Sequence, residues 1–200
     1  MPERAADVID TLVGIAPGSP LDAIRARRPE ARTHAQATYR ALFEPEAPGN
    51  VTAHERFAVA AFVAGLHGDA STAAFYAKAL AASGASAALR EAVDAAVAEA
   101  SARGPYGSYP PGPLSREDTA GPSYRIGATT RRALGPRLAA AFEHVHMLVF
   151  HPRDAAPAAL QALLEAGWLT TDVVTLSQII AFLSFQIRVV AGLRTLAGRA

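Results

Sequence analysis

The sequence predicts an all-α fold, and three observations support this prediction. Alanine, leucine and arginine, which are strong helix formers, are abundant among the 200 residues. Apolar residues recur at helical spacing in most segments of the chain. Strand-like runs, in which β-branched and polar residues alternate, are missing. Because 50% of the residues are hydrophobic, a chain of this length can bury a core without a disulfide or a metal.

Composition also excludes several classes of protein. The formal net charge is only +1 and no dense basic stripe is present, so we expect no nucleic-acid partner. The absence of cysteine excludes thiol peroxidases, cysteine hydrolases, iron–sulfur clusters and cysteine-ligated zinc. The charged N-terminus lacks the apolar segment of a signal peptide. The longest uncharged apolar run, residues 173–187, is shorter than the roughly 20 residues of a membrane span, so we expect a cytoplasmic protein without a membrane partner.

Residues 1–50 are predicted to form a helical arm that packs on the rest of the chain. Residues 7–15 have an amphipathic pattern, a second helix begins at Pro20, and a third spans residues 30–43. A segment rich in proline and glycine then breaks the chain and ends the arm.

Residues 51–103 are predicted to form the first of two helical halves. Thr52 and Glu55 have the spacing of a capping box, in which two residues cap each other's free backbone N–H groups at a helix start. Asp69 or Ser71 is expected to cap the second helix of this half, and Ser86 is expected to cap the third.

Residues 104–135 are rich in proline and glycine, and we predict an irregular connecting loop there. Helices resume at Pro136, a residue type favoured at the first helical position, and residues 136–200 form the second predicted half. Asp154 is expected to cap its middle helix, and Thr170 is expected to cap its long final helix.

The two predicted halves follow the same plan. When His67 is aligned with His151, Gly84 falls one residue from Gly167, and the three helices of each half occur in the same order. This weak self-similarity predicts a duplicated three-helix unit.

His67 and His151 end the first helix of each predicted repeat, and two interpretations of them stay open. A histidine at a helix C-terminus interacts favourably with the helix dipole and offers N–H groups to the last carbonyls. Alternatively, both imidazoles reach a shared cleft and act as acid or base. Arg153 has a guanidinium that can clamp a carboxylate or a phosphate, or it is a solvated turn residue.

Glu143 and His146 stand three residues apart, on one face of a helix. Di-iron bundles use such a Glu-x-x-His pair twice, and this chain has one copy, so we expect no dinuclear site. A mononuclear metal site that adds His151 is a weaker alternative. The simpler interpretation is a partly buried polar pair at a helix contact or a subunit contact.

The final helix carries Ser177, Ser184 and Arg188 within about 40° of one another, at about 100° per residue. Nearly all its other positions are apolar, so we expect it at the centre of the fold or in a subunit interface. A buried Arg188 requires an acidic partner. The candidate partners are Glu143, Glu165 and Asp172.

Two segments carry a resemblance to a known family. Glu55 opens the apolar helix ERFAVAA, after which come a tight turn and a short helix, and VTLSQIIAFLSFQIRVVAGL is similar to a closing helix of the family. Over roughly residues 50–103 and 136–196, the chain resembles the alkylhydroperoxidase D-like and carboxymuconolactone decarboxylase superfamily. This resemblance implies an alkylhydroperoxidase D-like helical bundle and a homo-oligomer, as a trimer or hexamer, or as a dimer.

Thiol-peroxidase members of this superfamily have a glutamate followed about twelve residues later by Cys-x-x-Cys. His67 stands twelve residues after Glu55, and no cysteine is present, so a thiolate relay cannot operate. Of that pattern only Glu55 carries over. Decarboxylase-type members resemble this chain in lacking the thiol pair, and they use acid–base groups on a small lactone or keto acid without a cofactor.

The resemblance therefore implies proton transfer on a small oxygenated organic acid or lactone, with no cofactor and no metal. The predicted catalytic residues are Glu55, His67 and His151, and the predicted substrate-binding residues are Tyr76, His146 and Arg153. The alternative is a non-catalytic protein that keeps the fold to bind a small molecule or a partner. A closed or apolar cavity without convergent polar groups would favour that alternative.

Overall fold

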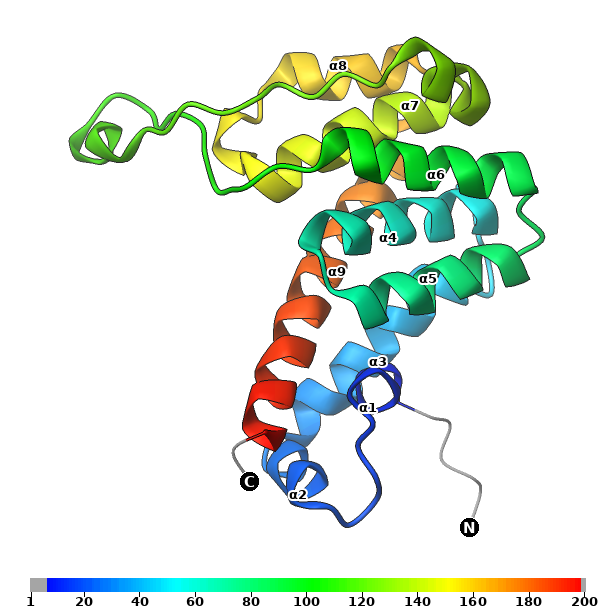
Figure 1. Ribbon diagram of the computed structural model, residues 1–200, viewed down its shortest axis with the longest axis vertical. Helices are drawn as coiled ribbons and strands as arrows, with labels where there is room; N and C mark the ends of the chain where they lie inside the picture. Colours follow the sequence, from blue (N-terminus) through cyan, green and yellow to red (C-terminus); the bar gives the residue numbers. More distant parts are fainter. Residues whose placement is uncertain (1–6, 199–200) are drawn as a thin grey trace.

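A computed structural model describes residues 7–198 and confirms the all-α prediction (Figure 1). Two short 3-10 helices, η1 (Pro113–Glu117) and η2 (Pro152–Asp154), lie in the second half of the chain. The α-helices are α1 (Val8–Val13), α2 (Pro20–Ala26), α3 (Pro29–Phe43), α4 (Ala53–His67), α5 (Ala70–Ala82), α6 (Ala87–Ala100), α7 (Ala128–Phe150), α8 (Pro157–Glu165) and α9 (Thr170–Ala197).

Helix α9 runs along the length of the molecule (Figure 1). Its N-terminal part contacts α4, α7 and α8, and its C-terminal part lies against the three helices of the N-terminal arm. The predicted burial of this helix is correct for one face only, because Val174 is 53% exposed and Phe185 is 46% exposed. By length and composition α9 could also cross a membrane, and 44% of its most apolar window is buried inside the protein.

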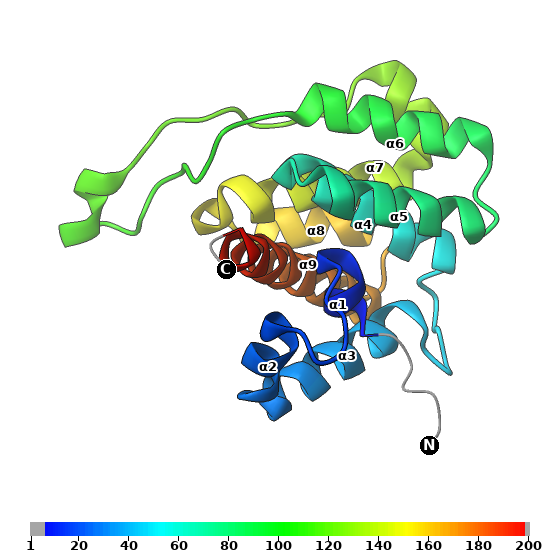
Figure 2. The ribbon, with the colours of Figure 1, turned by 60° about the horizontal axis from the view of Figure 1, so that its bottom comes forward.

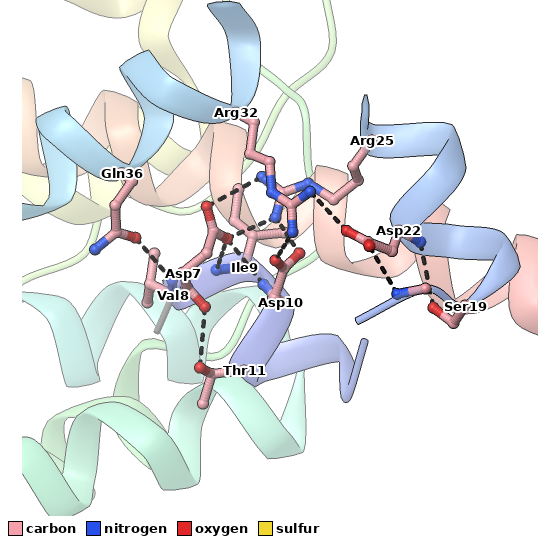
Figure 3. A network of polar contacts seen from close by, with 11 residues as sticks. Asp7, Val8, Ile9, Asp10, Thr11, Ser19, Asp22, Arg25, Arg32 and Gln36 are labelled. Atoms are coloured by element: carbon pink, nitrogen blue, oxygen red, sulfur yellow. Dashed lines mark hydrogen bonds and ion pairs between the residues drawn. The ribbon is translucent and has the colours of Figure 1, made fainter. Parts of the chain in front are cut away.

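An ion-pair network joins the three helices of the arm (Figure 3). The buried Arg25 of α2 contacts Asp10 and lies 2.6 Å from Asp7. Arg32 of α3 contacts Asp10 and lies 2.7 Å from Asp22. Asp7 is also the N-cap of α1, since its carboxylate accepts hydrogen bonds from two backbone N–H groups. The network explains how three short helices hold one arrangement, as the sequence predicts for a packed arm.

The two predicted halves meet in the core. Phe62 of α4 and Phe142 of α7 stack with their ring centroids 4.1 Å apart. Gly65 lets α4 approach α6, because a β-carbon there would lie 2.6 Å from Val97 Cγ2. Each predicted half contains three α-helices, and the third helices differ in length, since α9 has 28 residues and α6 has 14.

Helix starts show where local prediction succeeds. The predicted capping box of Thr52 and Glu55 is confirmed, as are the N-caps Asp69 and Ser86. The predicted N-caps Asp154 and Thr170 are wrong, as is the predicted ending of the loop at residue 135.

The physical reasons for these corrections lie in contacts far along the chain. Helix α7 begins at Ala128 because Glu99 of α6 accepts hydrogen bonds from the Gly127 N–H group and the Thr130 hydroxyl. Gly135, with a φ of +77°, then kinks α7 where Pro136 follows.

The other two corrections concern the starts of α8 and α9. The Asp154 carboxylate accepts a hydrogen bond from the Ser108 N–H group 2.8 Å away, and α8 begins later, at Pro157. The N-cap of α9 is Leu169, whose N–H group donates to the Asp172 carboxylate.

Residues 104–127 confirm the predicted irregular connection. They project from the helical body as an extended arm that carries η1 near its tip (Figures 1 and 2). Within the described residues, one isolated bridge between Gly107 and Thr119 is the only pairing of extended backbone.

Candidate functional site

A cleft lies where α4, α7 and α9 come together. It has a volume of about 510 Å³ and is called the His67 cleft here. Its polar lining residues are His67, Ser177, Ser184 and Arg188. Its apolar wall includes Leu148, Val149, Phe150 and Ile180. The polar face predicted for the final helix therefore lines one cleft together with the histidine that ends α4.

His67 is half-buried, and its Nε2 lies 3.4 Å from the Ser184 hydroxyl oxygen. Burial lowers the pKa of His67, and the positive charge of Arg188 lowers it further. The imidazole is therefore neutral at pH 7, and one of its ring nitrogens can accept a proton.

Arg188 is exposed, which corrects the expectation that it is buried with an acidic partner. Its Nη1 donates to the Ser184 carbonyl of its own helix, 2.9 Å away. Among residues 7–198, no carboxylate lies within ion-pair distance of its guanidinium. An arginine without a counter-charge at the mouth of a cleft is available to an anion.

Glu55 lies outside this cleft, at the opposite end of α4 from His67. There it forms a junction with Arg137 of α7 and Asp172 of α9. Arg137 Nε lies 2.6 Å from the Glu55 carboxylate, and Arg137 Nη2 lies 3.0 Å from that of Asp172. The guanidinium also sits 4.1 Å from the ring centroid of Trp168. Because Glu55 also forms the capping box, both of its oxygens are engaged in holding the fold. Sequence reasoning missed Arg137, which is 82 residues from Glu55.

Tyr76 is fully buried and does not line the His67 cleft. Its hydroxyl donates to the Gln186 side-chain oxygen, 2.6 Å away. Burial raises the pKa of Tyr76 above its ordinary value. This pair joins α5 to α9, and nothing in the sequence pattern singles out Gln186.

The structure does not bring His67 and His151 into a shared cleft. His151 lines a second pocket, between α7 and α8, and its Nδ1 lies 3.1 Å from the Asp154 carboxylate. Its ring stacks on Tyr106, with centroids 4.8 Å apart. The buried His146 lies beside it, with ring centroids 5.6 Å apart. Burial, with the nearby His151, lowers the pKa of His146 to about 4.

Arg153 also lies outside the His67 cleft. Its guanidinium carbon is 4.2 Å from the ring centroid of Tyr109, and its Nη1 donates to the Glu117 carbonyl. Both contacts connect Arg153 to the projecting segment, residues 104–127.

The alternative of a metal site at Glu143, His146 and His151 finds no support. In the described part of the chain, no group of three histidine, aspartate or glutamate side chains is placed to hold a metal ion. The Glu143 carboxylate instead forms ion pairs with Arg125 and Arg131.

No protein-family model, curated protein or solved structure matches this chain. The resemblance to the carboxymuconolactone decarboxylase superfamily therefore rests on the residues of the sequence alone, and it stays a prediction.

Proposed function

We propose that the His67 cleft binds a small organic acid and that His67 transfers a proton on the bound molecule. The observation that carries this proposal is the combination of a neutral imidazole and an arginine without a counter-charge in one cleft. Arginine binds carboxylates through two parallel hydrogen bonds. The apolar wall beside it fits the carbon skeleton of the same molecule, and about 510 Å³ lies within the usual range for ligand pockets.

The proton transfer follows from the charges of the cleft. When a carboxylate binds Arg188, it offsets the positive charge that lowers the pKa of His67. Binding therefore makes the imidazole more basic when the substrate is in place. His67 then takes a proton from a carbon next to a carbonyl group and returns it to another atom of the same molecule. No electrons are gained or lost in this step.

The contact between His67 and Ser184 also suggests a serine nucleophile, but two features favour proton transfer. In the serine triad, a carboxylate orients the histidine, and within residues 7–198 none forms an ion pair with His67. Ser184 also lies in the middle of α9, where the backbone N–H groups are used within the helix and cannot stabilise an oxyanion.

Deuterium exchange tests this function without knowledge of the product. Small keto acids in D₂O are followed by NMR, and the protein is expected to accelerate the loss of the proton next to the carbonyl. The variant His67→Gln should lose this acceleration, and the exposed control His34→Gln should keep it. Binding without exchange would favour the non-catalytic alternative, and exchange that persists in His67→Gln would contradict the role of His67.

We also propose that the protein is a homo-oligomer, as the resemblance implies. The support is a set of large apolar side chains that α8 and α9 leave exposed to solvent. They are Leu160, Leu164, Val174, Phe185 and Leu196. Light scattering of the purified protein tests this proposal, and a monomer at all concentrations would contradict it.

A further inference from the structure

We propose that the acid bound in the His67 cleft carries a hydroxyl group at its far end, and that the Ser177 hydroxyl selects this group. The expected substrates are therefore hydroxy acids in which an extended carbon chain separates the carboxylate from the hydroxyl. This inference rests on the proposed function, because it takes Arg188 as the residue that holds the carboxylate. It goes further by assigning a role to Ser177, which the proton transfer does not use.

The polar groups of α9 are spread along the cleft. Ser177, Ala181 and Ser184 line it at spacings of four and three residues, so they share one face of the helix. Ser177 and Ser184 are seven residues apart, which places them about 10 Å from each other along the helix axis. The cleft therefore has two separate polar positions on this face, with the Ala181 methyl group between them.

The carboxylate and the reacting carbon belong near Ser184. Arg188 Nη1 donates to the Ser184 carbonyl 2.9 Å away, so the guanidinium lies beside this turn of the helix. His67 Nε2 lies 3.4 Å from the Ser184 hydroxyl oxygen, at the same turn. An acid held by Arg188 thus has the first carbons of its chain next to His67. The rest of the chain extends along α9 towards Ser177, because the cleft continues in that direction.

The space between the two polar positions suits a carbon chain. Ala181 presents only a methyl group there, so a ligand can lie against the helix. The opposite wall is apolar and consists of Leu148, Val149 and Phe150, with Ile180 beside them on α9. Burial of methylene groups against these side chains is favourable, because it removes apolar surface from water.

The hydrogen bonding of Ser177 selects the group at the far end of the chain. Its hydroxyl donates to the Val173 carbonyl 2.8 Å away, so the lone pairs of its oxygen are left for a donor from the ligand. A hydroxyl can donate to this oxygen, whereas a methyl group cannot, and a second carboxylate offers only acceptor atoms. Among the described residues that line the cleft none is acidic, so an ammonium group would lack a counter-charge.

Binding of four matched acids to the full chain tests the proposal. In an extended ω-hydroxyoctanoate the hydroxyl lies about 10 Å from the carboxylate carbon, which matches the spacing along α9. Octanoate ends in a methyl group, octanedioate ends in a second carboxylate, and acetate lacks the chain. Calorimetric titration gives each Kd. We expect ω-hydroxyoctanoate to bind about three- to tenfold more tightly than octanoate, and octanoate to bind more tightly than octanedioate and acetate.

Two variants locate the far end of the ligand. Ser177→Ala should remove the preference for ω-hydroxyoctanoate over octanoate. The control Ser83→Ala should keep it, because the Ser83 hydroxyl also donates to a helix carbonyl but lies outside the cleft. Ala181→Phe fills the space between the two serines. It should weaken the binding of ω-hydroxyoctanoate and octanoate at least tenfold more than it weakens the binding of acetate.

The outcomes separate this inference from the proposed function. If none of the four acids binds, or if Arg188→Gln weakens none of them, the proposed function fails and the inference fails with it. If the acids bind through Arg188 but ω-hydroxyoctanoate and octanoate bind equally well, the inference is overturned while the proposed function stands. The same holds if octanedioate binds best, or if the preference for the hydroxyl persists in Ser177→Ala.

Discussion

Arg137 of α7 lies beside α9 and Arg188 lies on α9, yet their surroundings differ in kind. The guanidinium of Arg137 contacts two carboxylates, two backbone carbonyls and the face of an indole ring. The guanidinium of Arg188 binds one carbonyl of its own helix and otherwise faces a cleft. The comparison teaches that a charged residue marks a site only where the fold has left it without a partner.

The histidines repeat this comparison. His146 is enclosed by aromatic rings, and burial is the main cause of its low pKa. His67 is half-buried at a cleft, and the charge that lowers its pKa further is one that a ligand can offset. The first histidine belongs to the core, and the second can respond to a bound molecule.

The largest expected effect is on stability, at the junction of Arg137. The variant Arg137→Met leaves Glu55 and Asp172 without their cation, and the side chain of Asp172 is only 3% exposed. We expect the free energy of unfolding to fall by about 3 kcal/mol, because a buried carboxylate loses its partner. Urea denaturation measures it. The control Arg125→Gln removes an exposed ion pair and should cost less than about 1 kcal/mol. Equal losses in both variants would contradict the structural role of Arg137.

A second effect concerns the pH dependence of stability. The pKa of His146 is about 4 in the folded protein, below its ordinary value of 6.5, so the unfolded chain binds the proton more tightly. The contribution of His146 to the free energy of unfolding is therefore fully present above pH 6.5. As the pH falls towards 4, the free energy of unfolding decreases by about 3 kcal/mol in total, because protonation favours the unfolded chain. His146→Phe should remove this part of the acid sensitivity. Denaturation at pH 7 and pH 4 measures it, and an unchanged difference would contradict the assignment.

A third effect concerns binding without a change in stability. Arg188→Gln should weaken the binding of small organic acids by about 10- to 100-fold, because it removes a charge-assisted pair of hydrogen bonds. Its free energy of unfolding should change by less than about 0.5 kcal/mol, since the side chain is exposed. Calorimetric titration checks the first value and denaturation the second. Arg90→Gln removes another exposed arginine, on α6, and should bind as the wild type does. Equal weakening in both variants would point to a general charge effect.

The smallest effect is expected at Ser184. Its hydroxyl lies 3.4 Å from His67 Nε2, which is long for a hydrogen bond, so Ser184→Ala should slow deuterium exchange only a few-fold. A complete loss of exchange in this variant would instead favour a direct role for the serine oxygen.

The sequence predicts features of this molecule that depend on neighbouring residues. The capping box of Thr52 and Glu55 spans three residues, and it forms where the pattern indicates. The face of Ser177, Ser184 and Arg188 depends only on helical periodicity, and it also forms. These features need no knowledge of what packs against them.

Features that depend on distant contacts were not predictable in the same way. The start of α7 depends on Glu99, 28 residues earlier than the N–H group that it binds. The Glu55 carboxylate is not free for acid–base chemistry, because it is bound by Arg137, 82 residues away. Arg188 was expected to be buried because its helix is apolar nearly all round, yet the fold covers only one face of α9. In each case the tertiary partner decides the role of the residue.

An NMR titration of the His67 ring, with and without a small organic acid, tests the central claim most directly. The proposed function predicts a pKa below the ordinary 6.5 for the free protein, and a rise of that pKa when the acid is bound. In Arg188→Gln the pKa should be higher already without the acid, and adding the acid should change it little. A His67 pKa that stays the same when the acid binds, or that does not differ between the wild type and Arg188→Gln, would contradict the claim that these two residues form one site.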